Sequence, residues 1–336
     1  MEMVMTYPIG FALRGFGRYL PASQQPSQSL DSLYGQPPGW TEARFGITSR
    51  PIASRAETSS VMAAHACREA LADAGWEEEA FDVLVGACGV MEQPIPGTSV
   101  LVHNALGLAK SGIPCLDVNM TCLSFVAALD QVSLAMKAGR YRRALVFSSD
   151  IASAGLDYDH PEMSAIFGDG AAAVCVEACD DGPAVLAARF KTLSQGKDLA
   201  HLRAGGTGVR IADGFDSLSQ AARFHMDAFG IFKAAGRHLP QLMADTVNDA
   251  GVTMEDIDTF ICHQASAPGL EYMRHLVKTR PERVVDIFSS CGNQIAASLP
   301  NALYVAHSDG RLTPGSHALL VGTSAGVSLG AMVLRL

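Results

Sequence analysis

Three residues far apart in the chain carry side chains that together could activate and hold a thioester. Cys122 stands between a strand-like segment, CLDVNM, and an apolar helical segment that begins LSFVAALD. At a helix N-terminus the macrodipole and the free amides lower the pKa of a thiol, which predicts a thiolate nucleophile at Cys122. Burial as a small packing residue is the alternative for Cys122, and it is the prediction for the other seven cysteines.

His263 and Asn293 are the two candidate partners of this thiol. His263 ends the strand-like segment TFICHQA, directly before a turn, where an imidazole could serve as a base or a hydrogen-bond donor. Asn293 lies in SSCGNQIAASLP, and its amide is a neutral donor suited to stabilising a thioester enolate. Taken alone, His263 could equally be structural and Asn293 an ordinary helix cap.

Composition excludes several other classes of function. The chain has 336 residues, 48% of them hydrophobic and 18% charged, with a formal net charge of -9. This acidic balance and the lack of a basic run argue against nucleic-acid binding, and no apolar stretch is long enough for a membrane span. The cysteines form no CxxC pair and the histidines no HExxH pattern, so no metal is expected. The first ten residues lack the features of a signal peptide, which predicts a cytoplasmic protein.

An internal repeat indicates how the chain is organised. Asp73-Ala74-Gly75 is followed by a strand-like segment opening at Asp82, and Asp249-Ala250-Gly251 by one opening at Asp258, with the same spacing. Seventeen residues likewise separate Cys122 from Gly139 and Asn293 from Gly310. We therefore expect an α/β protein of two duplicated halves, residues 1–180 and 181–336, with mainly parallel sheets.

The segments after Cys122 and Asn293 are apolar on nearly every side, so both are predicted to be helices buried between the sheets. Cys122 and Asn293 would then face each other at the N-termini of these helices. The Gly-rich stretch from about 180 to 224 is predicted to be loop or cap structure.

Taken together, Cys122, His263 and Asn293 with their flanks resemble the thiolase-fold condensing enzymes, specifically the 3-oxoacyl-ACP synthase III group, over essentially the whole chain. Six ordered motifs carry the resemblance: GFGRYLP, the W-x3-R-x-G-I-x2-R segment from Trp40 to Arg50, DVNMTCLSF, FGDGAAA, HQA with GN-x2-AAS-x-P, and the closing GTSAG-x-S-x-G. The resemblance implies a five-layered αβαβα sandwich and a homodimer.

The resemblance also implies an acyltransferase mechanism without a cofactor. Cys122 would take an acyl group from an acyl-CoA or acyl-carrier thioester, with the amides of Cys122 and Ala325 holding the oxyanion. His263 and Asn293 would then stabilise the enolate that forms when a malonyl-type thioester loses carbon dioxide. Trp40 and Arg44 occupy positions that usually meet coenzyme A or the pantetheine of the carrier.

Departures from the family pattern leave the substrates open. Pro268 stands where an Arg often helps to bind the carrier or the coenzyme, and such changes suggest a specialised fatty-acid or polyketide-type pathway. Relatives that join two acyl-CoAs head to head use a Glu donated across the dimer interface, where this chain has Ile95, with Glu92 three residues away. Ile95 is instead expected to line the acyl pocket; the other expected lining residues are Met226, Phe229 and Phe232.

Three other functions stay open at this point. The acyl group could pass to an alcohol or an amine, two acyl-CoAs could condense head to head without decarboxylation, or the chain could be a non-catalytic partner subunit. The intact Asn293 favours decarboxylative condensation over acyl transfer, and the complete set of three side chains argues against a non-catalytic role. A papain-like protease orders Cys, His and Asn in the same way, but the repeated α/β layout contradicts it.

Overall fold

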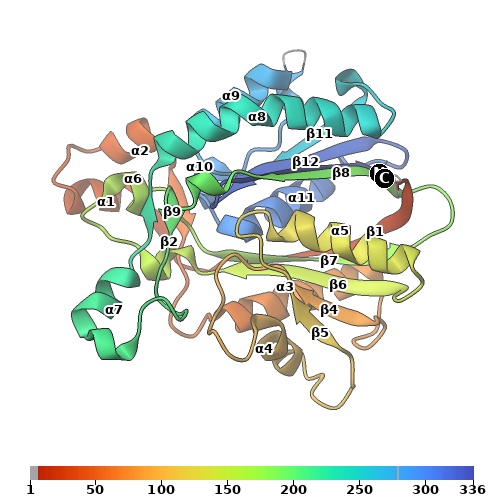
Figure 1. Ribbon diagram of the computed structural model, residues 1–336, viewed down its shortest axis with the longest axis horizontal. Coiled ribbons are helices and arrows are strands. Elements are labelled where there is room, and N and C mark those ends of the chain that lie inside the picture. Colours follow the sequence, from red (N-terminus) through yellow and green to blue (C-terminus); the bar gives the residue numbers. More distant parts are fainter. Residues whose placement is uncertain (1–6, 278–279) are drawn as a thin grey trace.

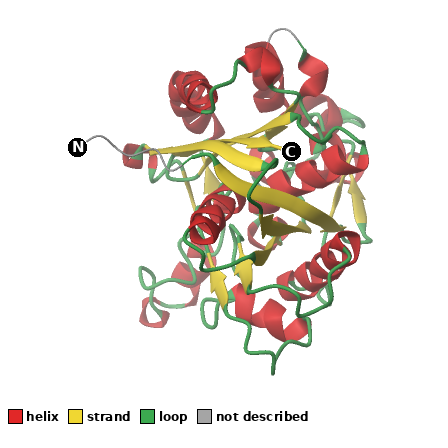
Figure 2. Ribbon diagram, turned by 90° about the vertical axis from the view of Figure 1, so that its right-hand side faces the viewer, coloured by secondary structure: helices red, strands yellow, loops and turns green. Residues whose placement is uncertain are grey.

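The computed structural model describes residues 7–277 and 280–336, which form five layers (Figure 1). Helices α8 and α9 form one outer layer and α3 and α4 the opposite one, with α5 and α11 in the middle between two groups of strands. Figure 2 shows the same arrangement after a quarter turn. The helices are α1 (Ser27–Leu33), α2 (Trp40–Phe45), α3 (Ser59–Ala74), α4 (Thr98–Ala105), α5 (Ser124–Lys137), α6 (Pro161–Ser164), α7 (Phe215–Ala221), α8 (Ala228–Asp249), α9 (Ala267–Val277), α10 (Phe288–Cys291) and α11 (Ser298–Ser308).

The main strands are hydrogen-bonded in the order β11-β12-β13-β8-β1-β7-β6-β4-β5. A short pairing between β1 and β8, at Ile9 with Val185 and Gly10 with Ala184, joins the two sheets. The strands are β1 (Ile9–Tyr19), β4 (Val83–Gly86), β5 (Cys115–Asp117), β6 (Arg143–Asp150), β7 (Gly170–Ala178), β8 (Ala184–Thr192), β11 (Thr259–Cys262), β12 (His317–Ser324) and β13 (Ser328–Arg335), besides the short strands β2 (Gln24–Pro26), β3 (Ser49–Pro51), β9 (Ala200–His201) and β10 (His225–Met226). The predicted division at residue 180 falls in the connection from β7 to β8 and stays a prediction.

The expectation of mainly parallel sheets is wrong. Only β4 with β5, β4 with β6, and β11 with β12 are parallel pairs among the nine strands. The other neighbours, including β6 with β7 and β12 with β13, are antiparallel. Strands buried on both faces are apolar throughout in parallel and in antiparallel sheets. Their composition therefore could not distinguish the two arrangements.

The stretch from about 180 to 224 is not all loop, as the sequence had suggested. It contains β8, a nine-residue strand that pairs with β13 along its length. The second part of the stretch does match the prediction, because α7 has no buried residue and projects from the layers at the lower left of Figure 1.

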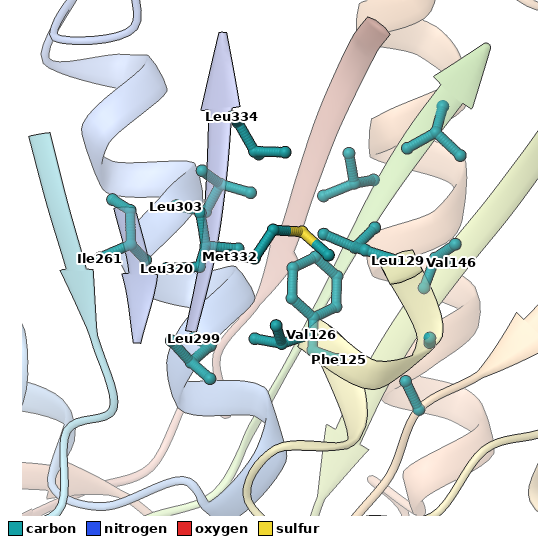
Figure 3. Packing of buried hydrophobic residues seen from close by; sticks show 14 of the residues in the cluster. Phe125, Val126, Leu129, Val146, Ile261, Leu299, Leu303, Leu320, Met332 and Leu334 are labelled. Atoms are coloured by element: carbon teal, nitrogen blue, oxygen red, sulfur yellow. The ribbon is translucent and has the colours of Figure 1, made fainter. Parts of the chain in front are cut away.

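The two central helices are buried as their composition predicted. Phe125 and Leu129 of α5 and Leu299 and Leu303 of α11 are shielded from solvent. Figure 3 shows these side chains meeting Met332 of β13 and their other neighbours from both sheets in one cluster. This packing fixes where each helix begins, and therefore where Cys122 and Asn293 lie.

Two glycines determine how closely the start of α5 approaches the strands. Gly322 of β12 pairs with Gly330 of β13, and Leu123, which follows Cys122, packs against both. A Cβ atom at position 322 would lie 2.8 Å from the Cβ of His263 and 3.2 Å from Cδ2 of Leu123. The residue after the nucleophile and the candidate histidine thus meet at a point where only a hydrogen fits.

We predict that Gly322→Ala destabilises the protein, because the added methyl group must displace His263 or Leu123. The free energy of unfolding, measured in urea, should fall by about 1–3 kcal/mol. Gly206→Ala is the matched control, since nothing lies within 4 Å of its added Cβ, and it should change the free energy by less than about 0.5 kcal/mol. Equal stability of the two variants would contradict this account of the packing.

Candidate active site

A cavity of about 630 Å³ lies between α8, α9 and the ends of the central strands. Cys122, His263 and Asn293 all line it, and so does Ala325. Most of the other lining side chains are apolar and come from α8, α9 and the segments after β6 and β8. The structure therefore brings together the three candidate side chains and the predicted oxyanion residue in one apolar cavity.

Cys122 precedes α5 by two residues, at a bend where Thr121 has a φ of 51°. Backbone amides of Cys122 and Ala325 are hydrogen-bonded to its thiol. These are the two amides that the sequence assigned to the oxyanion hole. They lie where an oxygen bound to the carbon attached to Sγ could reach them.

The expected low pKa of the Cys122 thiol is not what the structure indicates. Burial, followed by the negative charge of Asp150, raises this pKa to about 12, although both amide hydrogen bonds act to lower it. Desolvation of a thiolate outweighs the two amide hydrogen bonds here, because apolar side chains surround much of the thiol. Cys122 therefore rests as a thiol and must lose its proton to a base during the reaction.

His263 directly follows β11, and its amide donates to the carbonyl of Val321 on β12 (2.9 Å). Burial lowers the pKa of its imidazole to about 4, so the ring is neutral at physiological pH. Its Nδ1 is buried and has no hydrogen-bond partner in the described structure. A neutral ring with a nitrogen unclaimed by the protein can accept a proton or donate one to a ligand.

Gln264 holds the turn that carries His263, a role that the sequence did not reveal. Its buried side chain donates to the carbonyls of Cys262 (2.8 Å) and Val285 (3.1 Å) and accepts from the amide of Ile287 (3.0 Å). All its hydrogen bonds are thus made to backbone, which fixes the direction in which the strand leads into the histidine.

Asn293 is held by its backbone amide and by its side-chain oxygen. Its amide donates to the carbonyl of Ile166 (2.7 Å), and its Oδ1 accepts from the amide of Ile295 (2.9 Å). Because the oxygen is engaged, the NH2 group is the part of the side chain free to meet a ligand. Asn293 does not cap α11, whose N-cap is Ala297, so the cap interpretation is wrong.

Asp150, at the end of β6, is a buried carboxyl group beside the thiol that the sequence analysis missed. It accepts from the amides of Gly89 (2.8 Å), Val90 (2.7 Å) and Ala297 (3.1 Å). Burial raises its pKa to about 7. Gly89, Val90 and the segment before α11 surround Cys122 and Asn293, so this one carboxyl group connects the loops of both halves.

The predicted substrate-binding residues divide into two groups. Met226 and Phe232 line the cavity. Trp40 and Arg44 lie outside its wall on α2, whose end meets the first residue of α9 where Gly46 approaches Ala267. Their expected contact with a substrate stays a prediction.

Phe229 and Ile95 do not line this cavity, contrary to expectation. Phe229 is 75% exposed because it lies two residues from the lining residue Ile231, which places the two on opposite sides of α8. Ile95 is 87% exposed in the loop before α4 and is not among the residues that line the cavity.

We predict that Asp150→Asn makes the Cys122 thiol more acidic. Above pH 7 the carboxylate is charged and raises the pKa of the thiol, so its removal should lower that pKa. At pH 9, below the thiol pKa of about 12, iodoacetamide should alkylate Cys122 roughly two to ten times faster in the variant. Mass spectrometry of the labelled peptide measures this rate, and Asp309→Asn at an exposed site is the control. An unchanged or slower rate in a folded Asp150→Asn protein would contradict the assignment.

Two family models and many curated proteins match this chain. Residues 116–194 match the family model described as 3-oxoacyl-[acyl-carrier-protein] synthase III, and residues 247–336 match the C-terminal model of the same family. The β-ketoacyl-[acyl-carrier-protein] synthase III of Neisseria gonorrhoeae is 32% identical over 96% of this chain and 98% of its own length.

Solved structures show the same likeness over the whole fold. The 3-oxoacyl-[acyl-carrier-protein] synthase III of Aquifex aeolicus superimposes with a TM-score of 0.88 and 28% identity, covering 97% of this chain and all of that one. The priming β-ketosynthase of the R1128 polyketide pathway gives 0.85 and 25%, over 100% of this chain and 99% of the other. This chain therefore belongs to the 3-oxoacyl-[acyl-carrier-protein] synthase III family of thiolase-fold condensing enzymes.

Proposed function

We propose that Cys122, His263 and Asn293 carry out the acyl transfer and the decarboxylative condensation typical of this family of acyltransferases. The observation that carries the proposal is that all three side chains, together with Ala325, line a single apolar cavity. An apolar cavity accommodates the acyl chain, while its few polar groups mark the place of the reacting carbonyl.

The first step acylates the cysteine. Neutral His263 takes the proton of the Cys122 thiol as Sγ attacks the carbonyl carbon of an acyl thioester. The amides of Cys122 and Ala325 stabilise the oxyanion, and the carbon–sulfur bond to the carrier then breaks. The leaving thiolate recovers the proton from His263, which restores a neutral ring before the second substrate binds.

The second step forms the carbon–carbon bond. A malonyl-type thioester loses carbon dioxide, and the electron pair of the broken bond forms an enolate. The NH2 group of Asn293 and an N–H of His263 donate to its oxygen. The enolate carbon attacks the acyl carbon on Cys122, Sγ leaves as a thiolate, and a 3-oxoacyl thioester is released. A proton from solvent then restores the Cys122 thiol. Neutral donors suit this step, because a cationic imidazolium is disfavoured by burial.

Head-to-head condensation of two acyl-CoAs finds no general base in the loop before α4. Ile95 occupies the position of the expected Glu, and the nearby Glu92 is already engaged. Its carboxylate accepts from the amide of Ser60 at the start of α3 (2.7 Å). Acyl transfer to an alcohol or amine would use Cys122 and His263. It forms no enolate, so it would not need the NH2 group of Asn293.

The acyl donors and the malonyl donor are thioesters of coenzyme A, of an acyl carrier protein, or of both. An acidic chain needs a local basic patch to receive an acidic partner, and exposed Lys233 and Arg237 lie on α8 beside cavity-lining residues. Arg44 supplies a third cation near the start of α9. These three side chains have no ion-pair partner within residues 7–277 and 280–336, so their charges are open to phosphates or carboxylates.

We place the protein in the cytoplasm, and the proposal involves no metal or cofactor. No helix within the described residues is long and apolar enough to cross a membrane. Most of the N-terminal segment on which the prediction about export was based, residues 1–6, lies outside the described residues.

A homodimer is the assembly we propose, with Ile95 contributing to the contact between two copies. Ile95 is 87% exposed in one chain, and covering it with a second chain would stabilise the dimer. Light scattering should give the mass of a dimer at micromolar concentrations, and Ile95→Ser should shift the equilibrium toward monomer. A wild-type protein that stays monomeric at these concentrations would rule out this assembly.

Intact-mass analysis tests the chemical steps separately. Incubation with a panel of acyl-CoAs and acyl carriers should add one acyl group to the wild type and none to Cys122→Ala. Asn293→Ala should still form the adduct but release carbon dioxide from malonyl thioester about 10² to 10³ times more slowly. Asn248→Ala, at an exposed asparagine, is the control. An adduct on Cys122→Ala, or an adduct that decays only when an alcohol or amine is added, would refute the condensation mechanism.

A further inference from the structure

A second cavity, of about 550 Å³, lies directly behind one wall of the active-site cavity. The two cavities share three lining residues, His201, Phe224 and Met226. No step proposed above uses this second space. Its lining is charged and polar, whereas that of the first cavity is largely apolar.

His201 is the polar member of the shared wall. Its Nδ1 is shielded from solvent and has no hydrogen-bond partner in the described structure, a property it shares with His263. Burial, followed by nearby Arg203 and His225, lowers the pKa of its ring, which keeps it neutral. A buried nitrogen without a partner is costly, and such groups are rare unless a ligand completes them. The wall that an acyl chain would meet therefore offers one unused hydrogen bond.

The second cavity continues this polarity with ionisable side chains. Arg223 is paired with Asp157 at 2.7 Å, so these two charges offset each other. Arg203 has no ion-pair partner among the described residues. Glu162 is a further carboxylate in the lining of this cavity. The exposed guanidinium of Arg203 is thus an unpaired cation that lines the second cavity but not the first.

The wall between the cavities is thin. His201 and Met226 belong to β9 and β10, a ladder of only two residue pairs in which His201 lies opposite His225. The rings of these two histidines stack with centroids 5.0 Å apart. The neighbouring α7 buries no residue, so little packing holds this segment in place.

We propose that the acyl chain loaded on Cys122 carries an oxygen substituent at its far end, which hydrogen-bonds to His201. A terminal carboxylate makes fullest use of the site, because it would continue past His201 toward Arg203. This inference rests on the proposed function of Cys122, and it names the class of acyl group. The substrates are then ω-hydroxyacyl or ω-carboxyacyl thioesters rather than plain fatty acyl thioesters.

The test compares chains of equal length. Methyl-terminated, ω-hydroxy and ω-carboxy acyl-CoAs of six to sixteen carbons, as a rough span of the cavity, are incubated with the protein, and the rate of Cys122 acylation is followed by intact mass. At the length that reaches the wall, the oxygenated chains should react about tenfold faster, the effect of one hydrogen bond to a buried group. Faster reaction of the methyl-terminated chain at every length would overturn the proposal.

Variants assign the effect to its residues. His201→Phe should remove the preference for both oxygenated chains, and Arg203→Gln should reduce only the ω-carboxy rate. The thermal unfolding midpoints of both variants are compared with that of the wild type, which shows whether the fold is intact. Arg55→Gln, at an exposed arginine that lines neither cavity, is the matched control. A carboxylate preference that survives both variants would place recognition elsewhere and overturn the assignment.

Binding without chemistry separates this proposal from the proposed function. Calorimetry with Cys122→Ala and free acids should show tighter binding of the dicarboxylic acid than of the monocarboxylic acid of the same length. Equal or weaker binding would count against the second cavity even if acylation proceeds. If the dicarboxylic acid binds tightly but no acyl adduct forms on the wild type, the site stands and the condensation mechanism fails.

Discussion

The constraint on which the site depends is the start of two helices inside the protein. The first amides of a helix have no partner within it, and water does not reach the ends of α5 and α11. At the start of α5 the amides of Leu123 and Ser124 donate to backbone carbonyls of the preceding bend. Side chains of the helices hold that bend in turn: Ser124 Oγ accepts from the amide of Met120, and Ser298 Oγ from that of Gln294, each at 2.9 Å. Asp150 accepts from the amide of Ala297 before α11. The amides of Cys122 and of Ala325, which lies between β12 and β13, face the thiol instead, at the place of the proposed oxyanion.

The same burial determines the protonation states of the reacting groups. With a thiol pKa of about 12 and an imidazole pKa of about 4, Cys122 and His263 rest as a neutral pair rather than as thiolate and imidazolium. A helix N-terminus normally favours the thiolate, but two amide hydrogen bonds do not compensate for the loss of hydration. The neutral ring is what the later enolate requires, so one desolvated cavity serves both the nucleophile and the hydrogen-bond donors.

Sequence patterns were informative where local context decides the outcome. The central helices could be predicted because apolar residues on every face can be accommodated only inside a protein, and the motifs around Cys122, His263 and Asn293 identified the residues that meet in the cavity. Strand direction, the strand β8 within a Gly-rich region, and the thiol pKa could not be predicted, because each depends on neighbours distant in the chain. Asp150 was missed for the same reason: SSD at the end of a strand gives no sign that its carboxyl group receives amides from both halves.

The repeat also differs in detail from the spacing that first suggested it. Asn119 accepts a hydrogen bond from the amide of Thr121, and Asn293, 174 residues later, accepts one from the amide of Ile295. Thr121 and Ile295 also share a φ near 50°. Cys122 therefore corresponds in position to Ala296, not to Asn293. Each half contributes the same bend before a buried helix, but the proposed nucleophile follows the bend in one half and the proposed donor precedes it in the other. The same backbone bend, present once in each half, thus brings a thiol and an amide to one cavity, because different positions of the bend face that cavity.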